Sequence, residues 1–228
     1  MNQNPNPHII TPYPNGSFQA FLFDMDGTLL TSIESAERVW SRWLRMHSLD
    51  PEVFLPTIHG VQTLETIKGL CIPGIDPVEE AAWIAQEEAA DLEGVCVIEG
   101  AAEFISGLSD DGWAIVTSAT RDLAEARLEA AGLNAPPLFI TAEDIVAGKP
   151  APDCYIEAAS RLGKDVTQCL VFEDAPAGIE AGRAAGCSVV IVTRTHAHMM
   201  ETEYPRIRDF QNLTTRHRDG LITIVPLC

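Results

Sequence analysis

The chain has 228 residues, of which 46% are hydrophobic, and its formal net charge at pH 7 is -18. This length and composition provide for one well-packed core with a small inserted domain, and they are not typical of a disordered chain. Only 15 Lys and Arg face 33 Asp and Glu, which argues against nucleic acid as a partner. No stretch approaches the ~20 apolar residues of a membrane span, so we expect no membrane partner.

The cysteines and the first residues indicate the compartment and the start of the fold. The six cysteines show no CxxC or Cys/His ligand spacing, so we expect small core residues in a reducing compartment. The chain does not open with a basic region followed by an apolar run, and cytoplasm is the expected location. Residues 1–16 are rich in Pro and Asn and are predicted to form a flexible leader.

The first strong signal is the apolar run 19–23, which stops at Asp24 and Asp26 and is followed by Gly27. Such a run predicts a buried parallel strand, and ligands bind beyond the carboxyl ends of these strands. An isolated Asp-Gly usually marks a turn, but residues 32–46 then show helical spacing instead of a second strand. The pattern therefore predicts the start of a βαβ unit, with a metal or a nucleophile at the sheet edge.

Further apolar segments alternate with helical patterns along the rest of the chain, at residues 113–116, 138–140, 169–172 and 188–192. This alternation predicts an α/β fold with a doubly wound parallel sheet, a Rossmann-like core. The interval 33–97 contains helical patterns and Pro breaks but no convincing strand. We therefore expect an inserted all-helical cap at 33–97 and a discontinuous core of residues 17–32 and 98–228. Asp219-Gly220, between two β-patterned runs, predicts a hairpin.

Polar residues follow four of the predicted strands, namely Asp24 and Asp26, Thr117 and Ser118, Lys149, and Glu173 and Asp174. Because the carboxyl ends of parallel strands share one edge, these groups are expected to converge. Two unit charges ~4 Å apart repel by ~4 kcal/mol, so the carboxylates require protonation, a lysine or a divalent cation. Oxygen-only ligands in a site that also admits a phosphate favour Mg²⁺. The two hydroxyls and the backbone N–H of Ala119 are candidate phosphate ligands.

Four motifs in this order carry a family resemblance: DMDGT (24–28), VTSAT (116–120), GKPAPD (148–153) and FEDAPAG (172–178). From Phe18 onward the chain resembles the haloacid dehalogenase superfamily of phosphohydrolases. The helical insertion directly after the first motif is similar to the branch with a helical cap. That branch includes sugar phosphatases, glycerol-phosphate phosphatases and β-phosphoglucomutase.

The resemblance implies a role for each motif residue. Asp24 is then the nucleophile that forms an aspartyl-phosphate, and Asp26 is the general acid that later acts as a base. Lys149 is a catalytic and phosphate-binding residue. Mg²⁺ would be held by Asp24, the Asp26 carbonyl and Asp174, with Glu173 as a ligand or a supporting residue. The dehalogenases lack an acid at the position of Asp26, which favours phosphate chemistry.

Cap residues 37–43 and 58–63 resemble those of the sugar and polyol phosphatases, so His59, Gly60 and Gln62 are candidate substrate contacts. The mutases of this branch keep a His near Ala36, and a Lys and an Arg near His59 and Thr63. Ala36 and Thr63 lack that chemistry, which favours hydrolysis.

The predicted function is therefore Mg²⁺-dependent hydrolysis of a small phosphorylated sugar or polyol. A phosphosugar mutase and a non-catalytic binding or regulatory protein are the alternatives, and both a monomer and a homodimer are compatible with the sequence.

For three smaller groups of residues, we prefer a structural role to a role in binding or catalysis. Trp40 and Trp43 are typical of the buried stripe of a helix more than of a sugar-stacking platform. His196 and His198 lack a third metal ligand and are expected in a solvated loop. The basic run is expected to form an exposed face, and consists of Arg206, Arg208, Arg216 and Arg218.

Overall fold

Six parallel strands form the central sheet of the computed structural model, which describes residues 11–196 and 202–227. The strands lie in the order β5 (Phe139–Ile140), β4 (Trp113–Val116), β1 (Ala20–Phe23), β6 (Cys169–Glu173), β7 (Ser188–Val192) and β8 (Arg206–Ile207). The first strand of the chain is thus an interior strand, paired with β4 and β6. This position explains its unbroken apolar run, because both of its faces are buried.

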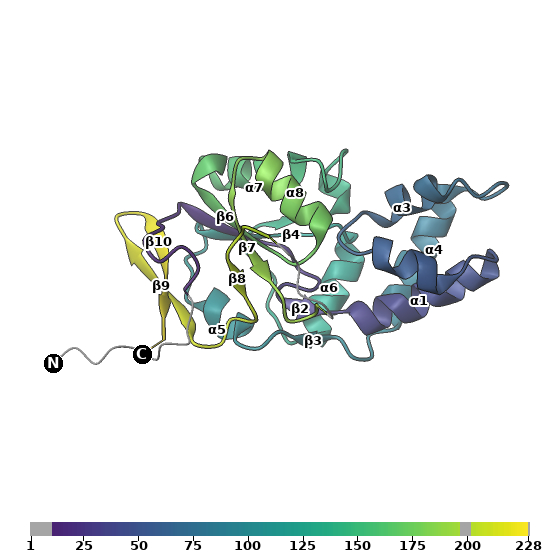
Figure 1. Cartoon of the computed structure of the whole chain (residues 1–228), viewed down its shortest axis with the longest axis horizontal. Helices are drawn as coiled ribbons and strands as arrows, with labels where there is room; N and C mark the ends of the chain where they lie inside the picture. The colour runs from purple at the N-terminus through teal and green to yellow at the C-terminus, as the bar shows by residue number, and fades with distance from the viewer. Residues whose placement is uncertain (1–10, 197–201, 228) are drawn as a thin grey trace.

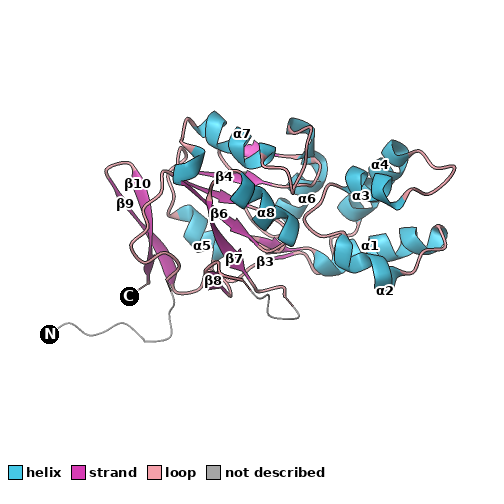
Figure 2. Cartoon of the chain, turned by 45° about the horizontal axis from the view of Figure 1, so that its top comes forward, coloured by secondary structure: helices cyan, strands magenta, loops and turns pink. Residues whose placement is uncertain are grey.

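Helices cover both faces of the sheet, as predicted for a doubly wound fold. The helices are α5 (Ala101–Ser106), α6 (Arg121–Ala130), α7 (Asp153–Leu162) and α8 (Pro176–Ala184). Side chains of β1 alternate between two apolar clusters: Phe21 packs with α5 and α6, and Leu22 packs with α7 and α8. In Figure 1, α7 and α8 lie above the sheet and α5 lies below it, and Figure 2 shows the same layers by element type.

The predicted C-terminal hairpin is present as β9 (Leu213–Arg218) and β10 (Leu221–Pro226). Its two turn residues, Asp219 and Gly220, have φ of 52° and 75°, as a two-residue hairpin turn requires. Apolar residues of the hairpin close the cluster around Phe21. The hairpin lies at the end of the molecule opposite the helical segment described next (Figure 1).

Along the sequence, a helical segment is inserted between β1 and the other strands of the sheet. It contains α1 (Ile33–Met46), α2 (Pro51–Phe54), η1 (Leu55–Thr57), α3 (Thr63–Leu70) and α4 (Pro77–Ala90). It has an apolar cluster of its own. The Asp50 and Asp76 side chains accept hydrogen bonds from backbone N–H groups at the starts of α2 and α4, and a Pro follows each of them. Proline therefore starts these helices instead of interrupting them.

Two short strands that were not predicted join this segment to the sheet domain. β2 (Leu30–Thr31) pairs antiparallel with β3 (Cys96–Val97). The chain thus leaves and re-enters the sheet domain at one place. Strands of two residues are too short to produce a periodic pattern, which is why sequence patterning did not indicate them.

Only part of the predicted leader, residues 11–16, is described by the structure. Residues 1–10 lie outside the described residues, but residues 11–16 pack on the sheet domain. The Tyr13 hydroxyl donates a hydrogen bond to the Val189 carbonyl at 3.1 Å, and its ring centroid lies 5.7 Å from that of Phe18. An aromatic side chain that can cover apolar surface therefore anchors this part of the leader.

Three other expectations have mixed outcomes. No helix in the described ranges is long and apolar enough to cross a membrane. The basic run is exposed, as predicted. The prediction that all cysteines lie in the core was wrong, because Cys71 follows the end of α3 and Cys96 lies on the short β3 at the surface. Burial holds for Cys154 and Cys169, Cys187 is half-buried, and Cys228 and His198 lie outside the described residues.

Candidate active site

The loop after β1 places Asp24 and Asp26 at the carboxyl edge of the sheet. Asp24 is only 5% exposed. Gly27 in this loop has φ of 90°, and a Cβ there would lie 2.0 Å from the Asp174 carboxylate oxygen Oδ2. Glycine is thus required both by the left-handed backbone and by the approach of Asp174. The Asp174 carboxylate, which follows β6, therefore lies against the loop that carries Asp24 and Asp26 after β1.

Lys149 is the buried cation of this cluster. Its Nζ atom donates to Asp24 Oδ1 at 2.6 Å, to Glu173 Oε1 at 2.7 Å and to the Val116 carbonyl at 3.0 Å. Three acceptors match the three hydrogens of an ammonium group. Burial acts to lower the pKa of Lys149, but the charges of Asp24 and Glu173 outweigh it and raise that pKa well above its ordinary value. Lys149 therefore carries a fixed positive charge.

Every acceptor position of the Glu173 carboxylate is in use. Oε1 accepts from Lys149 and from the Tyr155 hydroxyl, and Oε2 accepts from the backbone N–H groups of Asp174 and Ala175. A carboxylate has about four lone-pair sites, so these four donors saturate it. Of the two alternatives for Glu173, the contacts favour a supporting residue that holds Lys149 in place.

Asp24, Glu173 and Asp174 form an all-oxygen group that suits a metal ion. Their ligand atoms lie within 4.8 Å of one another, and all three residues are buried. Asp174 Oδ1 is buried without a hydrogen-bond partner among the described residues. Burial, followed by the charge of Glu173, raises the pKa of Asp24 from 3.8 to about 8, and the same causes raise that of Asp174. A hard divalent cation at this place would satisfy the orphaned oxygen and relieve the repulsion.

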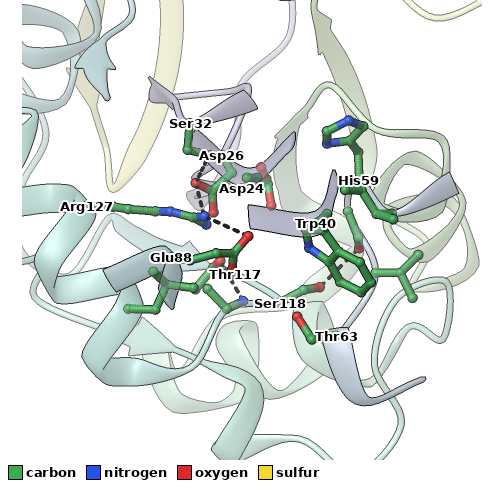
Figure 3. Close-up of a pocket in the computed structure, with 16 residues that line it drawn as sticks. Asp24, Asp26, Ser32, Trp40, His59, Thr63, Glu88, Thr117, Ser118 and Arg127 are labelled. Atoms are coloured by element: carbon green, nitrogen blue, oxygen red, sulfur yellow. Dashed lines mark hydrogen bonds and ion pairs between the residues drawn. The ribbon is translucent and has the colours of Figure 1, made fainter. Parts of the chain in front are cut away.

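The Asp26 carboxylate lies apart from this group and lines a pocket. Its Oδ1 atom accepts hydrogen bonds from Ser32 Oγ at 2.6 Å and from Arg127 Nη1 at 3.1 Å. Arg127 Nη2 lies 3.4 Å from Glu88 Oε1, on α4. Figure 3 shows these four side chains converging.

Ser32, Arg127 and Glu88 are site residues that no motif in the sequence indicates. A signal for Arg127 existed, because it is a charged residue on the buried stripe of α6 with Leu123 and Leu128.

The phosphate-binding candidates after β4 are held by local contacts. Thr117 Oγ1 accepts a hydrogen bond from the Ala119 N–H at 3.1 Å, so the Ala119 donor is already engaged. Ser118 Oγ donates to the Gly60 carbonyl of the helical segment at 3.1 Å. The Thr117 hydroxyl keeps its own hydrogen for a ligand. These contacts favour Thr117 over Ser118 as the phosphate hydroxyl.

The candidate residues of the helical segment divide into two places. His59 and Gly60 line the pocket that Asp24 and Asp26 also line. Gln62 lines a neighbouring pocket together with Ser118 and Ala119, and its role as a substrate contact stays a prediction. Its Nε2 donates to the Ala142 carbonyl at 3.4 Å, and its amide carbon would lie 2.7 Å from a Cβ on Gly148. At the start of α3, Gln62 points toward the core loop before Lys149 instead of toward the carboxylates.

The pocket lies between the sheet edge and the helical segment (Figure 3). Its volume is about 70 Å³. Trp40 and Trp43 are buried in the core of the segment, as preferred, and Trp40 also lines the pocket. His196 is half-buried and its Nε2 lies 2.9 Å from the Asp174 carbonyl, so the expected solvated loop was wrong for this residue.

Comparisons with known proteins agree with these motifs. The sequence model of the haloacid dehalogenase-like hydrolases matches residues 18–186. The chain belongs to the haloacid dehalogenase-like hydrolases. Among its relatives, hexitol phosphatase A from Escherichia coli is 43% identical over 178 residues, which are 76% of this chain and 82% of the relative. The 2-deoxyglucose-6-phosphate phosphatase 2 from Saccharomyces cerevisiae is 34% identical over 205 residues, 80% of this chain and 83% of the relative.

Two solved structures share the fold. A hydrolase from Pseudomonas syringae has a TM-score of 0.65 and 25% identity, with 79% of this chain and 86% of that chain covered. CbbY from Rhodobacter sphaeroides, solved in complex with phosphate, has a TM-score of 0.71 at 20% identity, with 85% and 95% covered. The predicted family and the predicted α/β core are thereby confirmed.

Proposed function

We propose that this haloacid dehalogenase-like hydrolase is a Mg²⁺-dependent phosphatase of small phosphorylated sugars or polyols that acts through an aspartyl-phosphate. The carrying observation is the Asp24 carboxylate, which is buried, bound by Lys149 at 2.6 Å and open to a pocket that Asp26 also lines. The substrate class is supported by the names of the relatives, a hexitol phosphatase and a 2-deoxyglucose-6-phosphate phosphatase.

In this proposal, the carboxylates of Asp24 and Asp174 and the carbonyl of Asp26 hold the metal ion. The orphaned Oδ1 of Asp174 supports this assignment, and the saturated Glu173 acts through Lys149. A bound Mg²⁺ neutralises charge on the phosphoryl oxygens and on the two carboxylates. The Thr117 hydroxyl then binds the phosphoryl group from the side of the core. Lys149, whose three hydrogens are taken, contributes its positive charge.

The first half-reaction transfers the phosphoryl group to Asp24. An Asp24 oxygen forms a bond to phosphorus while the bond from phosphorus to the sugar oxygen breaks. Asp26 gives its proton to that oxygen, so the sugar leaves as a neutral alcohol. Splitting one difficult displacement into two easier ones is the advantage of the covalent intermediate.

The second half-reaction reverses the role of Asp26. Its carboxylate takes a proton from water as the water oxygen attacks phosphorus, and the bond from phosphorus to the Asp24 oxygen breaks. Inorganic phosphate leaves and Asp26 is protonated again. One carboxyl group thus serves both half-reactions if it is held in one place, where Ser32 and Arg127 contact it.

Hydrolysis is favoured over the mutase alternative by the pocket lining. Ala36 and Thr63 both line the pocket. Neither is a cation, whereas the mutases of this branch place cationic side chains near these positions to hold a second phosphate. These two positions therefore offer no cationic site for a second phosphate.

The helical segment is, in this proposal, a cap domain of residues 33–97 on a core of residues 17–32 and 98–228. The pocket volume of about 70 Å³ is small for a whole hexose phosphate, so we expect the cap to move when the substrate enters. The Ser118–Gly60 hydrogen bond joins the two parts in the closed arrangement. A cytoplasmic location, consistent with the free thiols, is part of the same proposal.

A panel of sugar and polyol phosphates, assayed for phosphate release with and without Mg²⁺, tests the function. Asp24→Asn should lose nearly all turnover while remaining folded, and exposed Asp110→Asn is the matched control. An Asp24→Asn variant that keeps half of its activity contradicts the nucleophile assignment. Isomerised sugar phosphate in place of free phosphate supports a mutase, and no release from the whole panel supports a binding protein.

A further inference from the structure

Arg127 occupies a place where a charged side chain is expensive. It lies on the buried stripe of α6 and is 4% exposed. The negative groups that face it are Asp26 and Glu88, with Nη1 3.1 Å from Asp26 Oδ1 and Nη2 3.4 Å from Glu88 Oε1. Burying a guanidinium is unfavourable unless its partners compensate, and an apolar residue would fill the same volume without that cost. Packing alone therefore does not account for a buried arginine at this position.

The contacts of Asp26 suggest that explanation. Both hydrogen bonds found for its carboxyl group within the described ranges reach Oδ1, one from Ser32 and one from Arg127. Two donors on one oxygen fix the plane of the carboxyl group and leave Oδ2 available to a ligand. A planar guanidinium on a helix imposes direction as well as charge. A freely rotating carboxyl group would meet the substrate oxygen only part of the time.

Glu88 is the second acidic partner of Arg127. It projects from α4, a different part of the chain from α6, and is itself buried. Its carboxylate lies 3.4 Å from Arg127 Nη2, an ion pair without a hydrogen bond, and balances the charge of the guanidinium. The hydrogen bond to Asp26 comes from Nη1. Figure 3 shows the Asp26 and Glu88 carboxylates at the end of the Arg127 side chain, each joined to it by a dashed line.

We infer that Arg127, held by Glu88, is a positioning residue that fixes the Asp26 carboxyl group for proton transfer to the leaving oxygen. This inference rests on the proposed function, since it needs Asp26 as the proton carrier. It concerns the step in which the bond from phosphorus to the sugar oxygen breaks and that oxygen takes the Asp26 proton.

The test compares two leaving groups. An alkoxide needs a proton to leave, whereas nitrophenolate is a weak base and leaves without one. We would measure the first half-reaction by rapid quench with sorbitol 6-phosphate and with p-nitrophenyl phosphate. Arg127→Met should slow the alkyl phosphate by about 10- to 100-fold through kcat, with KM and the aryl phosphate changed by less than about threefold. Arg127→Lys, which keeps the charge but not the planar fork, should fall between.

Matched variants separate this role from a structural one. Glu88→Gln should give the same leaving-group pattern with a smaller loss of about 3- to 10-fold, and Glu87→Gln, its exposed neighbour paired with Arg42, should change neither substrate by more than about twofold. If Arg127→Met does not fold, Arg127→Lys and Glu88→Gln make the same comparison. Equal losses with both phosphates, or no loss with either, would overturn the inference.

Asp26→Asn distinguishes failure of the inference from failure of the proposed function. If Asp26→Asn slows both phosphates equally in the first half-reaction, Asp26 is not the acid and the proposed function fails at this step, and the inference falls with it. If Asp26→Asn shows the leaving-group pattern and the Arg127 and Glu88 variants do not, the inference alone fails.

Discussion

The raised pKa of Asp24 predicts that removing this carboxylate stabilises the metal-free protein. Burial and the charge of Glu173 raise the pKa from 3.8 to about 8 in the folded chain. Between these two values the folded protein keeps a proton that the unfolded chain releases. The free energy of unfolding therefore falls as the pH rises through this window. Asp24→Asn should be more stable than the parent chain in EDTA.

The size of the effect follows from the pKa and the pH. At pH 7, keeping Asp24 protonated while the unfolded chain ionises costs on the order of a few kcal/mol, and the cost is smaller at pH 5. Asn has the shape of the protonated Asp and does not ionise. Because Asn Oδ1 can still accept a hydrogen bond from Lys149, we expect a net gain on the order of a few kcal/mol at pH 7 and at most half of that at pH 5.

Urea unfolding in EDTA at pH 5 and at pH 7, followed by circular dichroism, measures this gain. Asp110→Asn is the control and should change stability by less than about 0.5 kcal/mol, since Asp110 is exposed. Excess Mg²⁺ should stabilise the parent chain by about 3 kcal/mol at 100 times Kd and Asp24→Asn by less, which closes the gap. A variant that is less stable than the parent at pH 7, or a gain that does not depend on pH, would refute the reasoning.

Three further predictions concern the groups around Glu173. Gly178→Ala would place a methyl carbon 1.5 Å from Glu173 Oε1, and should lower the free energy of unfolding by about 3 kcal/mol. Its control, Gly69→Ala in α3, meets no atom within 4 Å and should raise it by about 0.5–1 kcal/mol. Tyr155→Phe removes one donor to Glu173 and should cost about 1–2 kcal/mol, with a larger loss arguing for a packing role. Mg²⁺ binding at pH 7 should release a proton from Asp24, and calorimetry in buffers of different ionisation enthalpy would show no dependence if Asp24 were already ionised.

Much of the sheet and its edge could be predicted because the information is local. A buried strand needs a run of apolar residues, and Asp24, Thr117 and Glu173 each follow or end such a run. Parallel strands place these ends at one edge whatever the details of packing. The turn at Asp219 could also be predicted, since an Asp-Gly pair between β-patterned runs specifies its own backbone conformation.

The contacts across the pocket could not be predicted in this way. Glu88 and Arg127 lie on separate helices, and nothing in their sequence neighbourhoods fixes how those helices face each other. The same holds for Gln62, whose direction depends on where α3 meets the loop at Gly148. Side-chain direction across two packed elements is a property of the packing, because many relative placements keep the same apolar stripes buried.

The sequence by itself determined which residues stand at the sheet edge and, through four motifs, the family to which the chain belongs. Tertiary structure alone decided which of their atoms are free to act. Glu173 has no open lone pair, Ser118 is engaged by the helical segment, and Arg127 holds Asp26 by one oxygen. Residue identity sets what a group can donate or accept, whereas the fold sets which partners have already taken that capacity.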